Sequence, residues 1–164
     1  MSDPSDFSRV WEIIEKVGIG MLTTRHDGCL RARPMDARAD REAGTLWFVT
    51  DVRGAKDDEI EADQEVGLVF IEPSERAYLS ITGRARVIRD TSKAQAIWKK
   101  TDDVWWPEGP SDPHVRVLRV DPSMAELWDG PSNAAVAAFE FAKARLTGEK
   151  PNLGENGKVT VAMK

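Results

Sequence analysis

The sequence has little cysteine, little histidine and no excess of positive charge, and each shortage excludes a class of protein. The single cysteine, Cys29, cannot form a disulfide within the chain, which fits a reducing compartment. The 164 residues include 23 basic and 28 acidic side chains, so the formal charge is −5. A general nucleic-acid binder needs net positive charge or a long basic stripe, and is therefore not expected. The two histidines, His26 and His114, lie in a predicted turn and at a predicted strand edge, which argues against a histidine-rich metal site.

Long apolar runs and the common catalytic motifs are missing as well. No apolar run approaches the roughly 18 residues that span a bilayer, and residues 1–4 lack the order of a signal peptide. We therefore expect a soluble, cytoplasmic protein without a membrane partner. The chain contains no phosphate-binding GxxxxGK[ST] loop, no HExxH, no CxxC and no GxSxG. Gly18-Ile19-Gly20 precedes a predicted strand and does not open a helix, so it is not a dinucleotide-binding fingerprint.

Length and periodicity predict one domain of the α+β class. We assign residues 1–148 to this domain and residues 149–164 to a polar tail, in which 159–163 could still pair with a strand. Short, evenly spaced strands without long βαβ alternation favour a mostly antiparallel barrel with flanking helices. The predicted helices cover 4–17, 53–63, 91–100 and 133–147, and the predicted strands cover 19–25, 29–38, 45–50, 65–71, 77–87, 114–121 and 124–128.

Two features of this pattern suggest an anion site. Arg53 and Lys56 stand at the start of the 53–63 helix, where the helix dipole favours negative charge, so a phosphate there would explain the cations. Alternatively, Asp57 and Asp58 supply the compensating charge themselves.

A second pair of cations lies on the preceding strand. Arg31 and Arg33 alternate with apolar residues and therefore project from one face of the 29–38 strand. They form either a solvated basic edge or, if that face meets Lys56, a fork that binds phosphate oxygens.

The order of several short motifs resembles one known family. Met21-Leu22-Thr23-Thr24, the Arg31–Met35 segment, Leu46–Thr50 and Lys56 with Asp58-Glu59-Ile60 follow one another as in the pyridoxamine 5'-phosphate oxidase-like split barrels that bind flavin. Tyr78–Gly83, Trp106-Pro107 and Glu126–Ser132 continue the match, which covers roughly residues 7–150 and is nearest to the general stress protein branch.

The resemblance implies a split β-barrel that forms a homodimer and binds FMN in clefts between the subunits. It places the FMN phosphate on Arg33 and Lys56, in agreement with the anion argument. It also implies that five further residues lie along the flavin ring and ribityl chain: Pro34, Met35, Val49, Thr50 and, from the C-terminal part, Trp128. The resemblance leaves two roles open for Trp105 and Trp106, which either cover the cleft or pack in the dimer interface.

Two departures from the oxidases count against pyridoxamine phosphate as the substrate. The Ser-Arg-Lys run of the oxidases is replaced by Gly54-Ala55-Lys56, and the C-terminal Arg-x-His segment that grips the substrate phosphate has no counterpart. The leading hypothesis is an FMN-binding redox protein for an unknown small molecule, with no catalytic side chain assigned. The alternatives are a flavin-binding or flavin-storage module without catalysis, and a deazaflavin-dependent reductase. Haem is disfavoured, because the histidines have no evident axial placement, and a purely structural protein would need a larger exposed apolar face.

Overall fold

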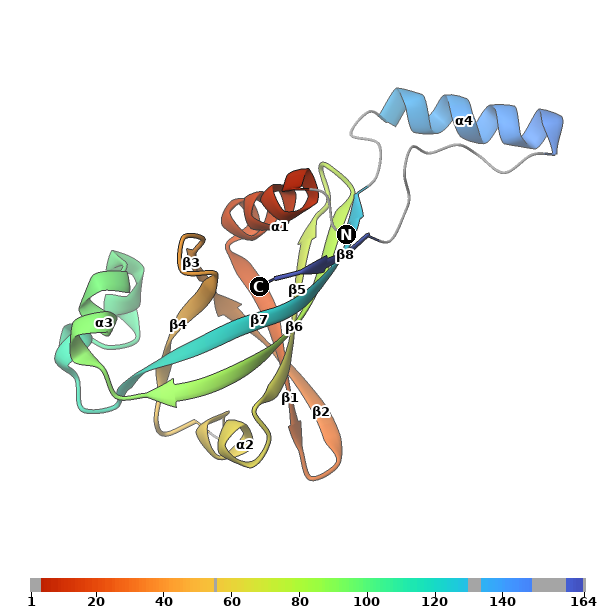
Figure 1. Cartoon of the computed structure of the whole chain (residues 1–164). Coiled ribbons are helices and arrows are strands. Elements are labelled where there is room, and N and C mark those ends of the chain that lie inside the picture. The colour runs from red at the N-terminus through yellow and green to blue at the C-terminus, as the bar shows by residue number, and fades with distance from the viewer. Residues whose placement is uncertain (1–3, 55, 130–133, 149–158, 164) are drawn as a thin grey trace.

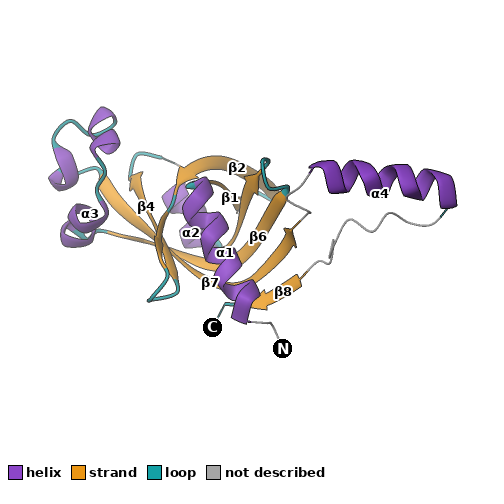
Figure 2. Cartoon of the chain, turned by 90° about the horizontal axis from the view of Figure 1, so that it is seen from above, coloured by secondary structure: helices purple, strands orange, loops and turns teal. Residues whose placement is uncertain are grey.

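The structure is a computed structural model that describes residues 4–54, 56–129, 134–148 and 159–163. Its helices and strands are shown in Figures 1 and 2. In chain order they are α1 (Pro4–Val17), β1 (Ile19–His26), β2 (Cys29–Asp36), β3 (Arg38–Asp40), β4 (Thr45–Asp51), α2 (Lys56–Ala62), β5 (Glu65–Glu72), β6 (Ala77–Ile88), α3 (Thr91–Ile97), the 3-10 helices η1 (Lys100–Val104) and η2 (Gly109–Ser111), β7 (Val115–Asp129), α4 (Ala134–Thr147) and β8 (Val159–Ala162).

The strands form one antiparallel sheet, which confirms the predicted α+β class. The strand order is β2-β1-β5-β6-β7-β4-β3, and β8 pairs with β7 outside this path. The first two strands form the predicted hairpin, whose turn contains Asp27 and Gly28 at positive φ. Strands β6 and β7 are long and strongly curved, so the sheet wraps around a central core (Figure 1).

The prediction of two strands at 114–121 and 124–128 is wrong, because β7 is one continuous strand. One edge of β7 pairs with β4 up to Val120 and with β8 from Met124 onward. Between these ladders lies Pro122, which has no N–H to donate, and the β6–β7 register shifts at Thr82/Gly83. A Cβ on Gly83 would lie 2.8 Å from the Asp121 carbonyl oxygen. The proline therefore marks an irregularity within an extended strand and does not end it.

The main core lies inside the barrel and is covered by α1. The predicted apolar stripe of this helix is confirmed, since Val10, Trp11 and Ile14 are buried and Phe7 packs against them. Gly18, at φ +72°, ends the helix as expected.

A second apolar cluster covers the outer side of β4. Trp47 and Val49 on this side pack with Trp106 and with residues of α3, while Leu46 and Phe48 point into the main core. The expectation that this strand is apolar on both faces is therefore confirmed. The second cluster fixes the 98–106 segment next to the end of β4.

Two helices and one strand are shorter than predicted. Helix α2 begins at Lys56, because the backbone N–H and guanidinium of Arg53 bond to Asp51 at 2.8 Å each and hold a turn before the helix. Helix α3 ends at Ile97, where Trp98 becomes extended. The strand predicted to reach residue 38 is divided at Ala37, whose N–H donates to the Gly18 carbonyl at 2.7 Å.

Helix α4 stands away from the barrel (Figures 1 and 2). Its predicted end at Gly148 is confirmed, whereas the predicted capping residue Ser132 lies outside the described residues. Phe139 and Leu146 of the predicted apolar stripe are exposed. In the segment assigned to the tail, β8 pairs with β7, as considered for residues 159–163. Among the described residues, none of the helices has the length and hydropathy required to cross a membrane.

Candidate functional site

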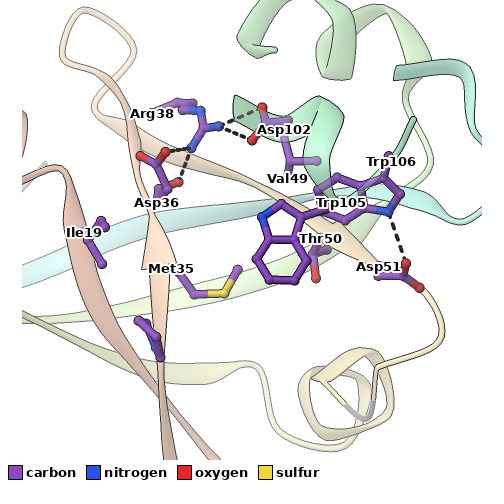
Figure 3. Close-up of a pocket in the computed structure, with 11 residues that line it drawn as sticks. Ile19, Met35, Asp36, Arg38, Val49, Thr50, Asp51, Asp102, Trp105 and Trp106 are labelled. Atoms are coloured by element: carbon purple, nitrogen blue, oxygen red, sulfur yellow. Dashed lines mark hydrogen bonds and ion pairs between the residues drawn. The ribbon is translucent and has the colours of Figure 1, made fainter. Parts of the chain in front are cut away.

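A cavity of about 450 Å³ opens between the end of β2, the end of β4 and the η1 segment. Its size falls within the range of about 300–1,000 Å³ that is usual for small-molecule sites. Strand β2 supplies one wall and β4 supplies the opposite one, while two adjacent indoles come from the loop after η1 (Figure 3). The lining residues are Ile19, Pro34, Met35, Asp36, Arg38, Val49, Thr50, Asp51, Asp102, Trp105 and Trp106.

Thr50 provides an unsatisfied polar atom in this otherwise apolar part of the cavity. Its side chain is buried, and within the described residues its Oγ1 has no hydrogen-bond partner. Met35, on the opposite wall, points toward the same space (Figure 3). A buried hydroxyl without a partner is destabilising by about 1–3 kcal/mol, so a ligand with a donor or acceptor here would restore a hydrogen bond.

Trp106 forms one side of the cavity and is held by Asp51. The Trp106 Nε1–H donates to Asp51 Oδ2 at 3.1 Å, and the indole is only 8% exposed. The Arg53 guanidinium bonds to the same carboxylate and, against the effect of partial burial, holds the pKa of Asp51 well below its usual range. Trp105 lies at the mouth and is 74% exposed. A flat aromatic ligand in the cavity would therefore contact the fixed indole of Trp106 and the exposed indole of Trp105.

The opposite rim is closed by a buried ion pair. The Arg38 Nη2 lies 2.8 Å from each oxygen of Asp102, and Arg38 also donates to the carbonyls of Asp36 and Ile97. Lys99 bonds to the Asp36 carboxylate at 2.8 Å. The charged groups of this rim thus neutralise one another, and their chief effect is to fix η1 against β3.

Arg33 lies next to the cavity-lining Pro34 but is engaged in a separate cluster. Its Nη2 donates to Glu59 Oε2 at 2.7 Å and its Nη1 donates to Thr24 Oγ1 at 2.5 Å. The Thr24 hydroxyl in turn donates to Glu59, whose carboxylate is 1% exposed. Arg31 forms a longer contact of 3.8 Å with the other oxygen of Glu59. The two arginines of β2 therefore converge on one buried acid, and they are not merely a solvated basic edge.

The structure brings together some of the predicted cofactor residues and separates another. Pro34, Met35, Val49 and Thr50 all line the cavity. Lys56 is the first residue of α2, and its side chain lies outside the described residues. Trp128 pairs with Tyr78 near the far end of β7, and it does not line the cavity of its own chain.

Sequence reasoning missed three residues that shape the site. Arg38 and Asp102 are far apart in the chain, and no motif connects them. Glu59 enters the sequence analysis only as part of the Asp58-Glu59-Ile60 motif, and no local signal in the sequence marks its carboxylate as buried.

Comparison with known proteins gives concordant matches that cover most of the chain. Residues 5–152 match the family described as "Pyridoxamine 5'-phosphate oxidase like". Protein bli-3 of Neurospora crassa is 25% identical over 140 residues, which cover 79% of this chain and 67% of that protein. A solved structure of general stress protein 26 from Jannaschia sp. CCS1 has a TM-score of 0.75 and 29% identity, and the match covers 98% of this chain and 99% of that one. The general stress FMN/FAD binding protein of Xanthomonas citri has a TM-score of 0.69 and 25% identity over 77% of this chain and 90% of that one. These structures share the split-barrel architecture, which confirms the predicted fold.

Proposed function

Because this chain belongs to the pyridoxamine 5'-phosphate oxidase like family, we propose that it is a redox protein that binds FMN in the cavity between β2 and β4. The observation that carries the proposal is the unsatisfied, buried hydroxyl of Thr50 in a cavity lined by Pro34, Met35 and Val49. These are positions that the family resemblance independently assigns to the flavin. A general stress FMN/FAD binding protein among the similar structures supports the same ligand class.

The side chains present fit a flavin mononucleotide. Met35, Val49 and the indole of Trp105 offer apolar surface to a flat ring system, and Thr50 offers a hydrogen bond to its polar edge. Arg33 and Lys56 would hold the phosphate. A bound flavin supplies hydride or electron transfer, whereas the chain supplies binding, orientation and exclusion of water.

A second copy of the chain would complete the site. The outer face of the sheet exposes Ile19, Met21, Ile71 and Tyr78, with exposed fractions between 40% and 58%. Ile71 pairs with Tyr78 across β5 and β6, and Met21 pairs with the exposed Val69 across β1 and β5, so these side chains lie along one apolar face of the sheet. Ile19 belongs both to this face and to the cavity lining. A homodimer formed through this face would therefore cover the mouth of the cavity.

The position of Trp128 supports the same arrangement. It pairs directly with Tyr78, and paired residues in a sheet project from the same face. Under this proposal Trp128 contributes to the cavity of the other subunit and not to that of its own chain.

A flavin-storage module without turnover is the second candidate. The charged residues that line the cavity are paired with protein groups, namely Arg38 with Asp102, Asp36 with Lys99, and Asp51 with Arg53. A general acid or base needs a group that can exchange a proton with the substrate. Stopped-flow mixing of the flavin-loaded protein with NADH or NADPH, followed by an electron acceptor, separates the candidates, because only a redox enzyme would turn over.

The proposal is tested by the visible absorption spectrum of the purified protein, recorded before and after addition of FMN and desalting. We expect a two-banded flavin spectrum that remains with the protein. The Arg33→Ala/Lys56→Ala double variant should lose the colour, while the Arg41→Ala/Lys100→Ala variant, which removes the same charges at exposed positions, should retain it. A wild-type protein that stays colourless would reject FMN, and a parallel titration with a deazaflavin would then test the remaining alternative.

A further inference from the structure

Glu59 of α2 is the most deeply buried carboxylate among the described residues, at 1% exposure, yet it does not line the cavity. Burying a carboxylate is unfavourable unless several groups bond to it. Here the Thr24 hydroxyl and the Arg33 guanidinium both donate to the same oxygen. A buried acid with this set of partners calls for an explanation beyond core packing.

The cluster holds the Arg33 guanidinium at two points. Nη2 donates to Glu59 at 2.7 Å, while Nη1 donates to the Thr24 hydroxyl at 2.5 Å, and that hydroxyl is itself bonded to Glu59. The plane of the guanidinium is therefore fixed by one acid–hydroxyl unit. Within the part of the chain that the structure describes, these bonds use only some of the five guanidinium N–H groups, and the side chain keeps 21% of its surface exposed. The remaining N–H groups are available to an anion from solvent.

The charge of Glu59 is maintained in this setting. Burial raises the pKa of Glu59, but the hydrogen bonds from Thr24 and Arg33 outweigh this effect and bring the pKa below its ordinary value. The acid therefore remains ionised at neutral pH. Its other oxygen lies 3.8 Å from Arg31, so a single fixed negative charge gathers two cations on one face of β2.

We propose that Glu59 is a positioning residue for phosphate binding: together with Thr24 it fixes the Arg33 guanidinium so that its free N–H groups meet the phosphate of the flavin. This inference rests on the proposed function. It assigns to Glu59 and Thr24 a role that acts through Arg33 without contact to the cofactor. The loss of either residue leaves Arg33 charged but held at only one of its two points, so the phosphate affinity falls while the affinity for the flavin ring does not.

The test compares the binding of FMN and riboflavin, which differ only in the phosphate, to Glu59→Gln and to wild-type protein. Quenching of flavin fluorescence gives both dissociation constants. We expect Glu59→Gln to bind FMN about tenfold more weakly or worse, while riboflavin binding changes by less than about threefold. Glu61→Gln removes the same charge from an exposed position of the same helix and should leave both constants unchanged.

A second variant keeps the test informative if Glu59→Gln folds poorly. Thr24→Val removes only the hydroxyl that links Glu59 to Arg33, and we expect it to weaken FMN binding selectively, by a smaller factor. Equal losses for FMN and riboflavin in these variants would show a merely structural role and overturn the inference. Tighter FMN binding would overturn it too, since Glu59 would then compete with the phosphate. If the wild-type protein binds neither flavin, the proposed function itself fails and the inference falls with it.

Discussion

Arg33 and Arg38 lie on β2 and β3, which follow each other in the chain but stand at opposite ends of the strand order. Each arginine meets a buried carboxylate from a helical segment, but the two pairs are built differently. Arg38 places one guanidinium nitrogen, Nη2, on both oxygens of Asp102 and uses the other two on backbone carbonyls, and its side chain is only 8% exposed. Arg33 makes two hydrogen bonds to the Glu59–Thr24 unit and remains 21% exposed. An arginine with a buried carboxylate thus forms a structural ion pair at Arg38–Asp102, and at Arg33–Glu59 it leaves an oriented cation that is partly exposed.

This difference in free donors indicates that the Arg38 pair contributes to stability and that the Arg33 pair is suited to ligand binding. A buried arginine whose donors are occupied can bind a ligand only by giving up some of its hydrogen bonds to the protein, whereas one with spare donors keeps them. We therefore expect the Arg38–Asp102 pair to set the shape of the cavity and, under the proposed function, the Arg33–Glu59 pair to serve phosphate binding. Substitution of each arginine by leucine is the direct way to test this division.

The largest effect is expected for Arg38→Leu. The substitution leaves Asp102 buried without its cation, which destabilises a protein by about 3–5 kcal/mol. Urea denaturation gives the free energy of unfolding, and the affinities for FMN and riboflavin should fall together. Arg86→Leu breaks an exposed pair with Asp121 and should change stability by less than about 1 kcal/mol. Equal effects of the two substitutions on stability would contradict the structural role of the Arg38–Asp102 pair.

Arg33→Leu should have a smaller effect on stability and a selective effect on binding. Glu59 keeps the hydrogen bond from Thr24 and the contact with Arg31, so we expect a loss of about 1–3 kcal/mol. FMN affinity should fall by at least about tenfold relative to riboflavin. If the substitution weakens the binding of FMN and riboflavin equally, Arg33 is not the phosphate ligand, and the two arginines do not differ in function as proposed.

The pH dependence of unfolding sharpens the comparison further. The pKa of Glu59 is lower in the folded protein than its ordinary value of 4.5, because the bonds from Thr24 and Arg33 outweigh burial. Its contribution to stability is thus complete above pH 4.5 and is lost as the pH falls through the lower, folded pKa. Glu59→Gln should reduce the slope of unfolding free energy against pH below this value. An unchanged slope would mean that Glu59 is not an ionised partner of Arg33.

The smallest change in stability is expected for Trp105→Ala. The indole is 74% exposed, so the free energy of unfolding should change by less than about 0.5 kcal/mol. The fluorescence of bound FMN should nevertheless rise, because an indole at the cavity mouth quenches it. Val104→Ala, at the neighbouring and similarly exposed position, serves as the control and should leave the fluorescence unaltered.

Local rules predicted most of the fold. The alternation along β6, the 3.6-residue stripe of α1 and the turn at Asp27-Gly28 are signals within single segments, and each is confirmed. The errors fall where long-range contacts decide. Residues 114–121 and 124–128 were predicted as two strands, but β7 continues through Pro122, where its edge partner changes from β4 to β8.

The candidate site, too, was predictable where the signal is local and unpredictable where it depends on long-range contacts. Four positions that the family resemblance pointed to, Pro34, Met35, Val49 and Thr50, do line one cavity. The partners of the arginines could not be predicted, because Glu59 and Asp102 reach them from segments 26 and 64 residues away in the chain. No local pattern encodes which of two nearby arginines is saturated and which retains free donors.

The central claim is that the cavity holds FMN with its phosphate on Arg33, and a crystal structure of the protein grown with FMN tests it most directly. We predict electron density for the flavin ring against Met35 and Thr50, the phosphate on the free N–H groups of Arg33, and the Glu59–Thr24 bonds intact. A flavin bound elsewhere on the chain, or a phosphate that leaves Arg33 untouched, would contradict the account.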